Sequence, residues 1–246
     1  MTLITKKSPA YSGTQRLLIK GDPNGTFRVK TSAAQPSLIT EGLVLHLDAG
    51  NITSYPGSGT TWYDLSGNGN DATLTNGVTY DSGNGGRFIF DGGDDYAPML
   101  TTGFPFGSSP GSISAWAKKG AGSGWIFAYG YPGGGQARFV GAISSFYYFG
   151  GYADDVYAVG VVTDTWFNIC GTYDGTYARL YVNGSLIAGP TVKGWNTVPS
   201  VSAVGRQVNG GEYWDGSVAQ VLVYDVALSD AQVAYNFDVT KTRFGL

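Results

Sequence analysis

Short runs of apolar residues, many of them alternating with polar ones, occupy most of the chain after Gly42 and are separated by turn residues. Such runs indicate β-strands, because successive side chains of a strand point to opposite faces of a sheet. The dipeptides Asp174-Gly175 and Asn183-Gly184 predict tight hairpin turns, because both supply the positive φ that these turns need. We expect strands at 43–47, 87–90, 112–118, 125–128, 137–140, 146–149, 156–162, 166–173, 178–182, 186–188, 202–204 and 217–224.

One helix is predicted close to the end of the chain. Ser229 is followed three residues later by Gln232, which forms a capping-box pattern, and Leu228 and Val233 fit a hydrophobic staple around it. We expect a short helix over about 230–237. Many short strands with one terminal helix predict an all-β, two-sheet antiparallel sandwich.

The first 41 residues have a different character from the rest and form a predicted N-terminal arm. Apolar runs at 17–20 and 26–30 flank a Pro/Asn/Gly turn and predict a β-hairpin, and 31–41 read as a linker. The arm carries six basic and two acidic residues, whereas 42–246 carry nine basic and sixteen acidic ones. A basic arm on an acidic body favours an interaction segment over a solvated tail. Its candidate assembly residues are Arg16, Leu17, Ile19, Lys20, Phe27, Arg28, Val29 and Lys30.

Composition narrows the class of protein further. The chain of 246 residues contains 39 glycines and 35 aromatic residues, and only 13% of it is charged, about half the usual share. This argues against a coiled coil, a helical bundle and a disordered chain. The first residues show no apolar segment of a secretory signal, and no run approaches the roughly 18 apolar residues of a membrane helix. We therefore expect folding in a reducing cytoplasm without membrane insertion, and the lone Cys170 leaves no internal disulfide.

Several motifs resemble LamG-like jelly-roll domains of the concanavalin A-like lectin/glucanase superfamily. They are WYDLSGNGNDA at 62–72, FDGGDDY at 90–96, SISAWAK at 112–118, WFNICGTYDG at 166–175, LYVNG at 180–184 and GSVAQVLVY at 216–224, followed by ALS at 227–229. The resemblance covers about 42–238 and implies that the sandwich, 42–246, is a jelly roll. The segments GLVLHLDA at 42–49 and RFGL at 243–246 resemble modules of tailed-phage virion proteins. Because this fold supports lectins, glycosidases and structural modules, the resemblance does not fix the function.

Catalytic chemistry finds little support in the residues. Glycoside hydrolysis needs two carboxylates at a fixed separation, and the only glutamates, Glu41 and Glu212, lie outside the Glu-x-Asp-x-(x)-Glu motif that the resemblance would imply for an enzyme. His46 is the only histidine, and Cys170 reads as a small core residue. No nucleophile elbow or P-loop is present. We expect a protein that is not an enzyme.

Two kinds of ligand stay open. Asp91, Asp94 and Asp95 share one Gly-rich turn and are candidate calcium ligands, although aspartates in turns also cap their own backbone. Sugar rings stack on aromatic side chains, so aromatic residues close to Gly-rich loops are candidate glycan platforms, with core packing or subunit contacts as the alternative. These candidates are Tyr129, Tyr131, Tyr147, Tyr148, Tyr152, Trp195, Tyr213 and Trp214. Nucleic acid is not expected, because the sequence pI is about 5.0 and no reading motif is present.

These observations together predict a structural protein of a tailed-phage virion, made in the host cytoplasm and located in the particle. The arm would anchor it to other virion proteins and form a homo-oligomer, and the sandwich would be displayed on a capsid, neck or tail, where its face either fills an interface or binds glycans of the host surface weakly. The alternative is a cellular or secreted lectin-like module that binds carbohydrate. A hydrolase is the third and least supported interpretation.

Overall fold

The computed structural model describes residues 19–21, 27–29 and 37–246. In the arm, β1 (Ile19–Gly21) pairs antiparallel with β2 (Phe27–Val29), so the predicted hairpin pairing is confirmed for these residues. Of the candidate assembly residues, Arg16, Leu17 and Lys30 lie outside the described residues.

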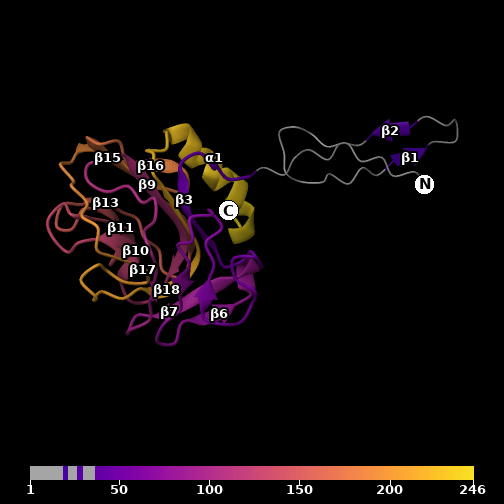
Figure 1. Ribbon diagram of the computed structural model, residues 1–246, viewed down its shortest axis with the longest axis horizontal. Coiled ribbons are helices and arrows are strands. Elements are labelled where there is room, and N and C mark those ends of the chain that lie inside the picture. Colours follow the sequence, from indigo (N-terminus) through magenta and orange to yellow (C-terminus); the bar gives the residue numbers. More distant parts are fainter. Residues whose placement is uncertain (1–18, 22–26, 30–36) are drawn as a thin grey trace. The chain divides into compact units, whose positions relative to one another are not determined.

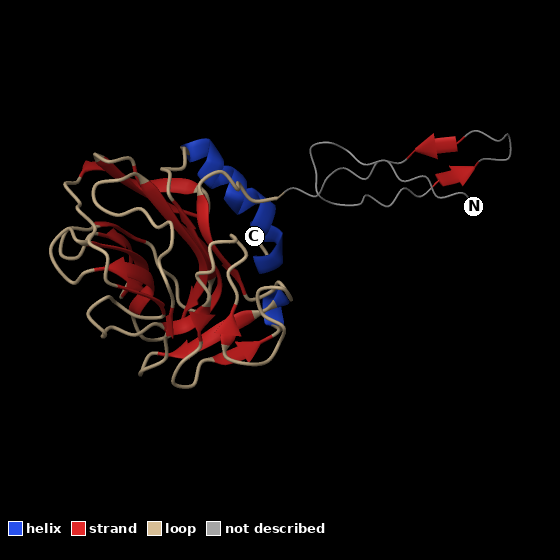
Figure 2. Cartoon of the chain, in the orientation of Figure 1, coloured by secondary structure: helices blue, strands red, loops and turns tan. Residues whose placement is uncertain are grey.

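The body of the protein is a sandwich of two antiparallel sheets, as predicted (Figures 1 and 2). The six-stranded sheet has the spatial order β13 (Val156–Val159), β12 (Phe146–Gly150), β11 (Ala137–Ile143), β10 (Gly124–Gly130), β17 (Val201–Val204) and β8 (Ala97–Pro98). The eight-stranded sheet has the order β16 (Ser185–Val192), β15 (Tyr177–Val182), β14 (Trp166–Tyr173), β9 (Gly111–Lys119), β18 (Asp215–Tyr224), β7 (Arg87–Asp91) and β6 (Thr79–Asp81), with β3 (Leu43–Asp48) paired to β18.

All twelve strands expected from the alternation are present, with ends shifted by a few residues. Four very short strands were missed: β4 (Thr61–Trp62), β5 (Ala72–Thr73), β6 and β8. Two or three residues carry too short an alternation to stand out from a loop. The Asn183-Gly184 turn is confirmed, because both residues have positive φ, 49° and 75°, between β15 and β16.

The space between the sheets is filled by aromatic side chains. This core includes fully buried rings from both sheets and from the loops that close them: Trp62, Phe88, Phe90, Phe127, Tyr129, Tyr173, Trp195 and Trp214. Burial of this much ring surface is the main force that holds the two sheets together.

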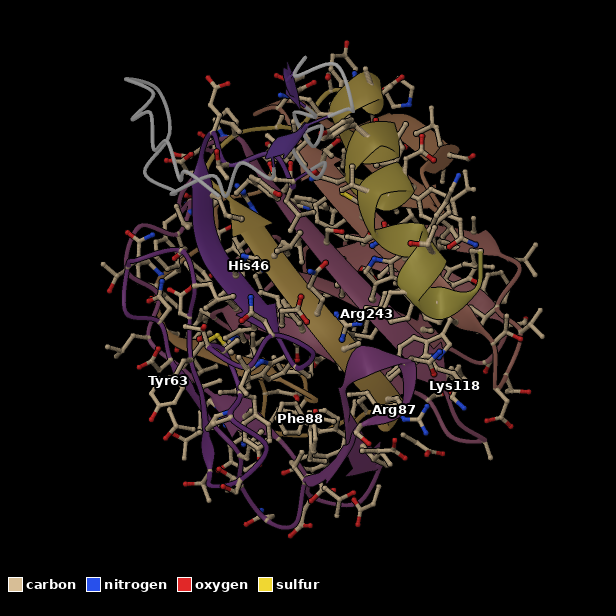
Figure 3. All side chains as sticks on the ribbon, turned by 90° about the vertical axis from the view of Figure 1, so that its right-hand side faces the viewer. His46, Tyr63, Arg87, Phe88, Lys118 and Arg243 are labelled. Carbon is tan, nitrogen blue, oxygen red and sulfur yellow. The ribbon has the colours of Figure 1, made fainter. Side chains whose placement is uncertain are left out.

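The C-terminal segment covers the outer face of the eight-stranded sheet. Helix α1 (Asp230–Thr240) begins at the predicted capping box of Ser229 and Gln232, and the 3-10 helix η2 (Lys241–Phe244) follows it directly. Figure 3 looks onto this face, with α1 lying across the strands and Arg243 beyond the end of the helix. Arg243 pairs with Asp48 on β3 at 2.6 Å and donates to the carbonyls of Asn84, within η1 (Gly83–Gly85), and of Gly86, directly after it. The central strands of this outer face are therefore covered by the protein itself, whereas β16 at the edge is exposed.

The body begins at Leu38, earlier than the boundary predicted before Gly42. The Ile39 N–H donates to Oδ1 of Asn236 at 2.9 Å, and the Ile39 carbonyl accepts from the Tyr224 hydroxyl at 3.1 Å. Leu38 and Ile39 also pack against the apolar cluster beneath α1. Within the described part of the chain, no helix is long and apolar enough to cross a membrane.

Candidate functional site

The outer face of the six-stranded sheet carries a row of aromatic side chains. Strand register places Trp125 of β10 opposite Gly141 of β11, Gly141 opposite Tyr148 of β12, and Tyr148 opposite Tyr157 of β13. Directly opposite residues of paired strands point to the same face. Trp125, Tyr148 and Tyr157 therefore form one line across four strands, which we call the aromatic row.

Alternation along β12 separates the row from the core. Tyr147 and Phe149 point inward and are buried in the main core, whereas Phe146 and Tyr148 point outward. Phe146 lies opposite Val159, next to the aromatic row. The outward side chains are partly open to solvent, and Tyr157 is 58% exposed.

The rings of the row pack against one another in sequence. The Tyr148 and Tyr157 centroids are 5.5 Å apart with an interplanar angle of 33°, and the Trp125 and Tyr148 centroids are 5.8 Å apart. The Phe146 ring stands edge-on to Tyr157 at 5.8 Å. Ring spacings of this size are favourable for aromatic pairs and hold each ring in place.

Two glycines make room for these rings. A Cβ atom on Gly141 would lie 2.7 Å from the Trp125 ring, and one on Gly150 would collide with Phe139 and with the Asp155 carboxylate. Trp125 and Phe139, whose ring centroids are 4.1 Å apart, therefore pack closely against the sheet and are buried. They support the exposed tyrosines from below and from the side.

Two carboxylates border the aromatic row. Asp155, in the loop before β13, lies over Gly150, and its Oδ1 has no hydrogen-bond partner among the described residues. Burial raises the pKa of Asp155 above its usual range. Burial raises the pKa of Tyr148, and the neighbouring charge of Asp155 adds to this effect. At the other end of the row, Glu212 Oε2 accepts a hydrogen bond of 2.5 Å from the Trp125 indole N–H.

Part of the glycan platform predicted from the sequence was wrong. Tyr129, Tyr147, Trp195 and Trp214 are buried, between 0% and 7% exposed, and all belong to the main core. A sugar cannot stack on a ring that other side chains already cover on both faces. These four residues are structural.

The remaining predicted platforms reach the surface at separate places. Tyr148 belongs to the aromatic row, and Tyr152 packs at the margin of its supporting cluster. Tyr131 is 49% exposed beyond the end of β10. The ring centroids of Tyr213 and Tyr96 are 6.5 Å apart. The Arg206 guanidinium carbon lies 3.7 Å from the Tyr96 ring centroid and covers that ring. Four residues of this region were not singled out from the sequence as binding residues: Phe146, Tyr157, Asp155 and Glu212. A signal was present for the tyrosine, because one face of each predicted strand, 146–149 and 156–162, had to point outward.

The predicted calcium ligands do come together. One carboxylate oxygen from each of Asp91, Asp94 and Asp95 lies within 4.8 Å of the others. Asp95 is 3% exposed, its Oδ2 accepts from the Asp91 N–H at 3.1 Å, and its Oδ1 has no partner within the described part of the chain. Burial raises the pKa of Asp95. Asp91 also accepts from the Gly93 N–H at 2.8 Å, which is the turn-capping role considered as the alternative.

The residues considered for nucleophilic catalysis lie elsewhere. Cys170 is buried on the outer face of β14 beneath α1, and burial raises the pKa of its thiol to about 12. Such a thiol is protonated at neutral pH and is not a nucleophile. Burial lowers the pKa of His46, which lies on β3 in the other sheet.

This architecture is that of a lectin-like β-sandwich with one outer sheet face covered at its central strands by the chain and the other bearing an aromatic row. The chain belongs to the family described as the Concanavalin A-like lectin/glucanases superfamily, whose Laminin_G_3 model matches residues 91–234. The comparison with curated proteins gave no match.

Several solved structures share the fold. The binding domain of botulinum neurotoxin DC, in complex with SialylT, has a TM-score of 0.62 at 16% identity and aligns over 82% of this chain and 52% of its own. A mutant Trypanosoma rangeli sialidase with trans-sialidase activity has a TM-score of 0.62 at 16% identity, over 85% of this chain and 35% of its own. Domain 4 of an extracellular GH43 arabinanase from Geobacillus stearothermophilus, in complex with arabinotriose, has a TM-score of 0.59 at 16% identity. The alignment covers 80% of this chain and 98% of that domain. This chain thus spans about half the length of the neurotoxin domain, and the likeness at these identities concerns the fold.

Proposed function

We propose that the protein is a non-enzymatic carbohydrate-binding module in which sugar rings stack on Tyr148 and Tyr157, the open rings of the aromatic row, while the buried Trp125 supports them. The observation that carries this proposal is the alignment of Trp125, Tyr148 and Tyr157 across four strands, bordered by the carboxylates of Asp155 and Glu212. The apolar faces of sugars pack on aromatic rings, and carboxylate oxygens accept hydrogen bonds from sugar hydroxyls. The solved structures in complex with arabinotriose and with SialylT support the use of this fold for such ligands.

Replacing the most exposed ring of the row tests the proposal. We expect Tyr157→Ala to weaken binding of a glycan found on an array by about tenfold, the equivalent of about 1.4 kcal/mol. The change should leave the melting temperature nearly unaltered, because Tyr157 is 58% exposed. Titration calorimetry on the purified variant measures both the affinity and the fraction of competent protein.

Tyr235→Ala is the matched control, since Tyr235 is 42% exposed on α1, over the other sheet. Equal binding by the wild type and Tyr157→Ala, or equal losses in the two variants, would contradict the placement of the site.

The module is, in our proposal, displayed on a tailed-phage virion, made in the host cytoplasm and joined to other virion proteins through residues 1–37. The pairing of β1 with β2 supports an arm that adds strands to a partner or to a second copy, because edge strands offer unpaired backbone groups. We expect light scattering to give a defined oligomer for the full chain. A chain beginning at Leu38, the start of the compact body, should be a folded monomer. If both are monomers, self-association through the arm is excluded and the free lectin-like module gains support.

Calcium is a further proposed ligand, held by Asp91, Asp94 and Asp95. The buried, unpartnered Oδ1 of Asp95 supports it, because an oxygen in this position lacks both water and a donor. We expect millimolar calcium to raise the melting temperature of the wild type by several degrees and to leave Asp95→Asn unchanged. A shift of the same size with magnesium, or no shift, would argue for the turn-capping role alone.

A further inference from the structure

We infer that the aromatic row selects neutral glycans and rejects glycans that carry a carboxylate or sulfate next to the stacked sugar. This inference rests on the proposed function and concerns the ligand class of the same site. It comes from the charges that border the row.

The first charge is Asp155, whose carboxylate forms no salt bridge with any described residue. Its side chain lies over Gly150 beside Phe139, and Gly150 is two residues after Tyr148 on the same face of β12. The neighbouring Lys193 ammonium donates to the backbone carbonyl of Asp155 at 3.0 Å but pairs with the carboxylate of Asp154 at 2.5 Å. Asp155 is partly exposed while its Oδ1 is shielded and unpartnered, so the side chain places a carboxylate without an ion pair beside the row.

The second charge is Glu212, at the Trp125 end of the row. Oε2 accepts from the Trp125 indole and from the Gln207 amide, which are neutral donors. Glu212 is exposed and makes no ion pair within residues 37–246. The row is thus bordered by Glu212 at its Trp125 end and by Asp155 beside Tyr148.

The cations close to these strands are directed elsewhere. Arg138 of β11 points into the core, where it donates to the carbonyls of Gly107 and Ser109 and lies 4.9 Å from the Tyr173 centroid. Arg206 stands over the Tyr96 ring. A carboxylate or sulfate placed on the row would meet two like charges, with neither Arg138 nor Arg206 directed at it, and like charges in a binding site discriminate strongly against a ligand.

Matched glycan pairs test the inference. The probes are galactose-terminated oligosaccharides with and without a terminal sialic acid, and oligogalacturonates against their methyl esters. For a pair that binds, we expect the affinity for the neutral glycan to be at least tenfold higher than the affinity for its anionic partner at 25 mM salt. The preference should shrink several-fold at 500 mM salt, because added ions screen the repulsion. In the double variant Asp155→Asn, Glu212→Gln, which keeps the shape of both side chains, the preference should also shrink several-fold.

Each other outcome has a definite meaning. If an anionic member binds as tightly as its neutral partner or more tightly at 25 mM salt, the inference is overturned while the proposed function stands. A preference that persists unchanged in the double variant also overturns it, because the selection would then come from shape. If no member of any pair binds, the proposed function fails and the inference falls with it. Melting curves of the variant, and of Glu212→Gln alone, show that the proteins compared are folded.

Discussion

Trp195→Ala is expected to lower the free energy of unfolding by about 3–5 kcal/mol, the usual cost of deleting a large buried aromatic side chain. Trp195 is 1% exposed although it lies in the loop after β16. Its ring fits between Phe149 and Tyr173, with both centroids 5.0 Å away. Removing the indole leaves a cavity at the end of the sandwich that these rings cannot fill by small movements.

Polar contacts add to this cost. The Trp195 indole N–H donates to the carbonyl and to Oδ2 of Asp154, both at 3.0 Å, and a Cβ atom on Gly151 would collide with the ring. Losing the N–H leaves these acceptors to water or to Lys193. Urea denaturation of the wild type, Trp195→Ala and Trp195→Phe measures the loss, and the Phe variant should recover part of it.

The same comparison decides between two roles for Trp195. A glycan platform at the surface would give a variant with unchanged stability and weakened binding. Stability within 1 kcal/mol of the wild type would show that this indole is not a core residue. Tyr157→Ala, with its exposed ring, is the reference in which binding falls and stability does not.

The strands could be predicted because alternation and turn residues are local signals. The Ser229–Gln232 capping box and the Asn183-Gly184 turn act within a few residues, and both formed as predicted. The sequence of a strand does not show which of its two faces points inward. On β12 the four consecutive aromatic residues Phe146 to Phe149 gave no local reason to choose Tyr148 over Tyr147 as the outward ring.

Whether an aromatic side chain in a loop is buried depends on contacts between residues that are far apart in the sequence. Trp195 is buried because Gly151 leaves room for it, and Trp125 lies flat because Gly141, on the next strand, has no side chain. No pattern within a short window contains these pairs. Asp155 became part of the candidate site in the same way, since its position over Gly150 and beside Phe139 depends on the register of β11 with β12.

Trp116→Ala should destabilise the protein by an amount similar to Trp195→Ala, about 3–5 kcal/mol, from the opposite side of the molecule. Trp116 lies on the outer face of β9 and is 1% exposed. Its ring stacks on Phe244, with a centroid distance of 4.0 Å and an interplanar angle of 17°. It also stacks on Phe237, with a centroid distance of 5.7 Å and an interplanar angle of 21°. Its indole N–H donates to Oγ1 of Thr240 at 2.8 Å. This one side chain therefore contacts both α1 and η2 and helps to hold them on the eight-stranded sheet.

Binding should nevertheless survive in Trp116→Ala, because the aromatic row lies on the outer face of the other sheet. At a temperature where the variant is folded, its affinity for a glycan should stay within about twofold of the wild type, a difference of about 0.4 kcal/mol. Calorimetry below the melting transition measures that affinity, and denaturation measures the lost stability. A tenfold loss of affinity in folded Trp116→Ala, with Tyr157→Ala unimpaired, would place the ligand on the face that α1 covers. The helix would then be a competitor for the ligand, and the row on the six-stranded sheet would have to be explained by packing alone.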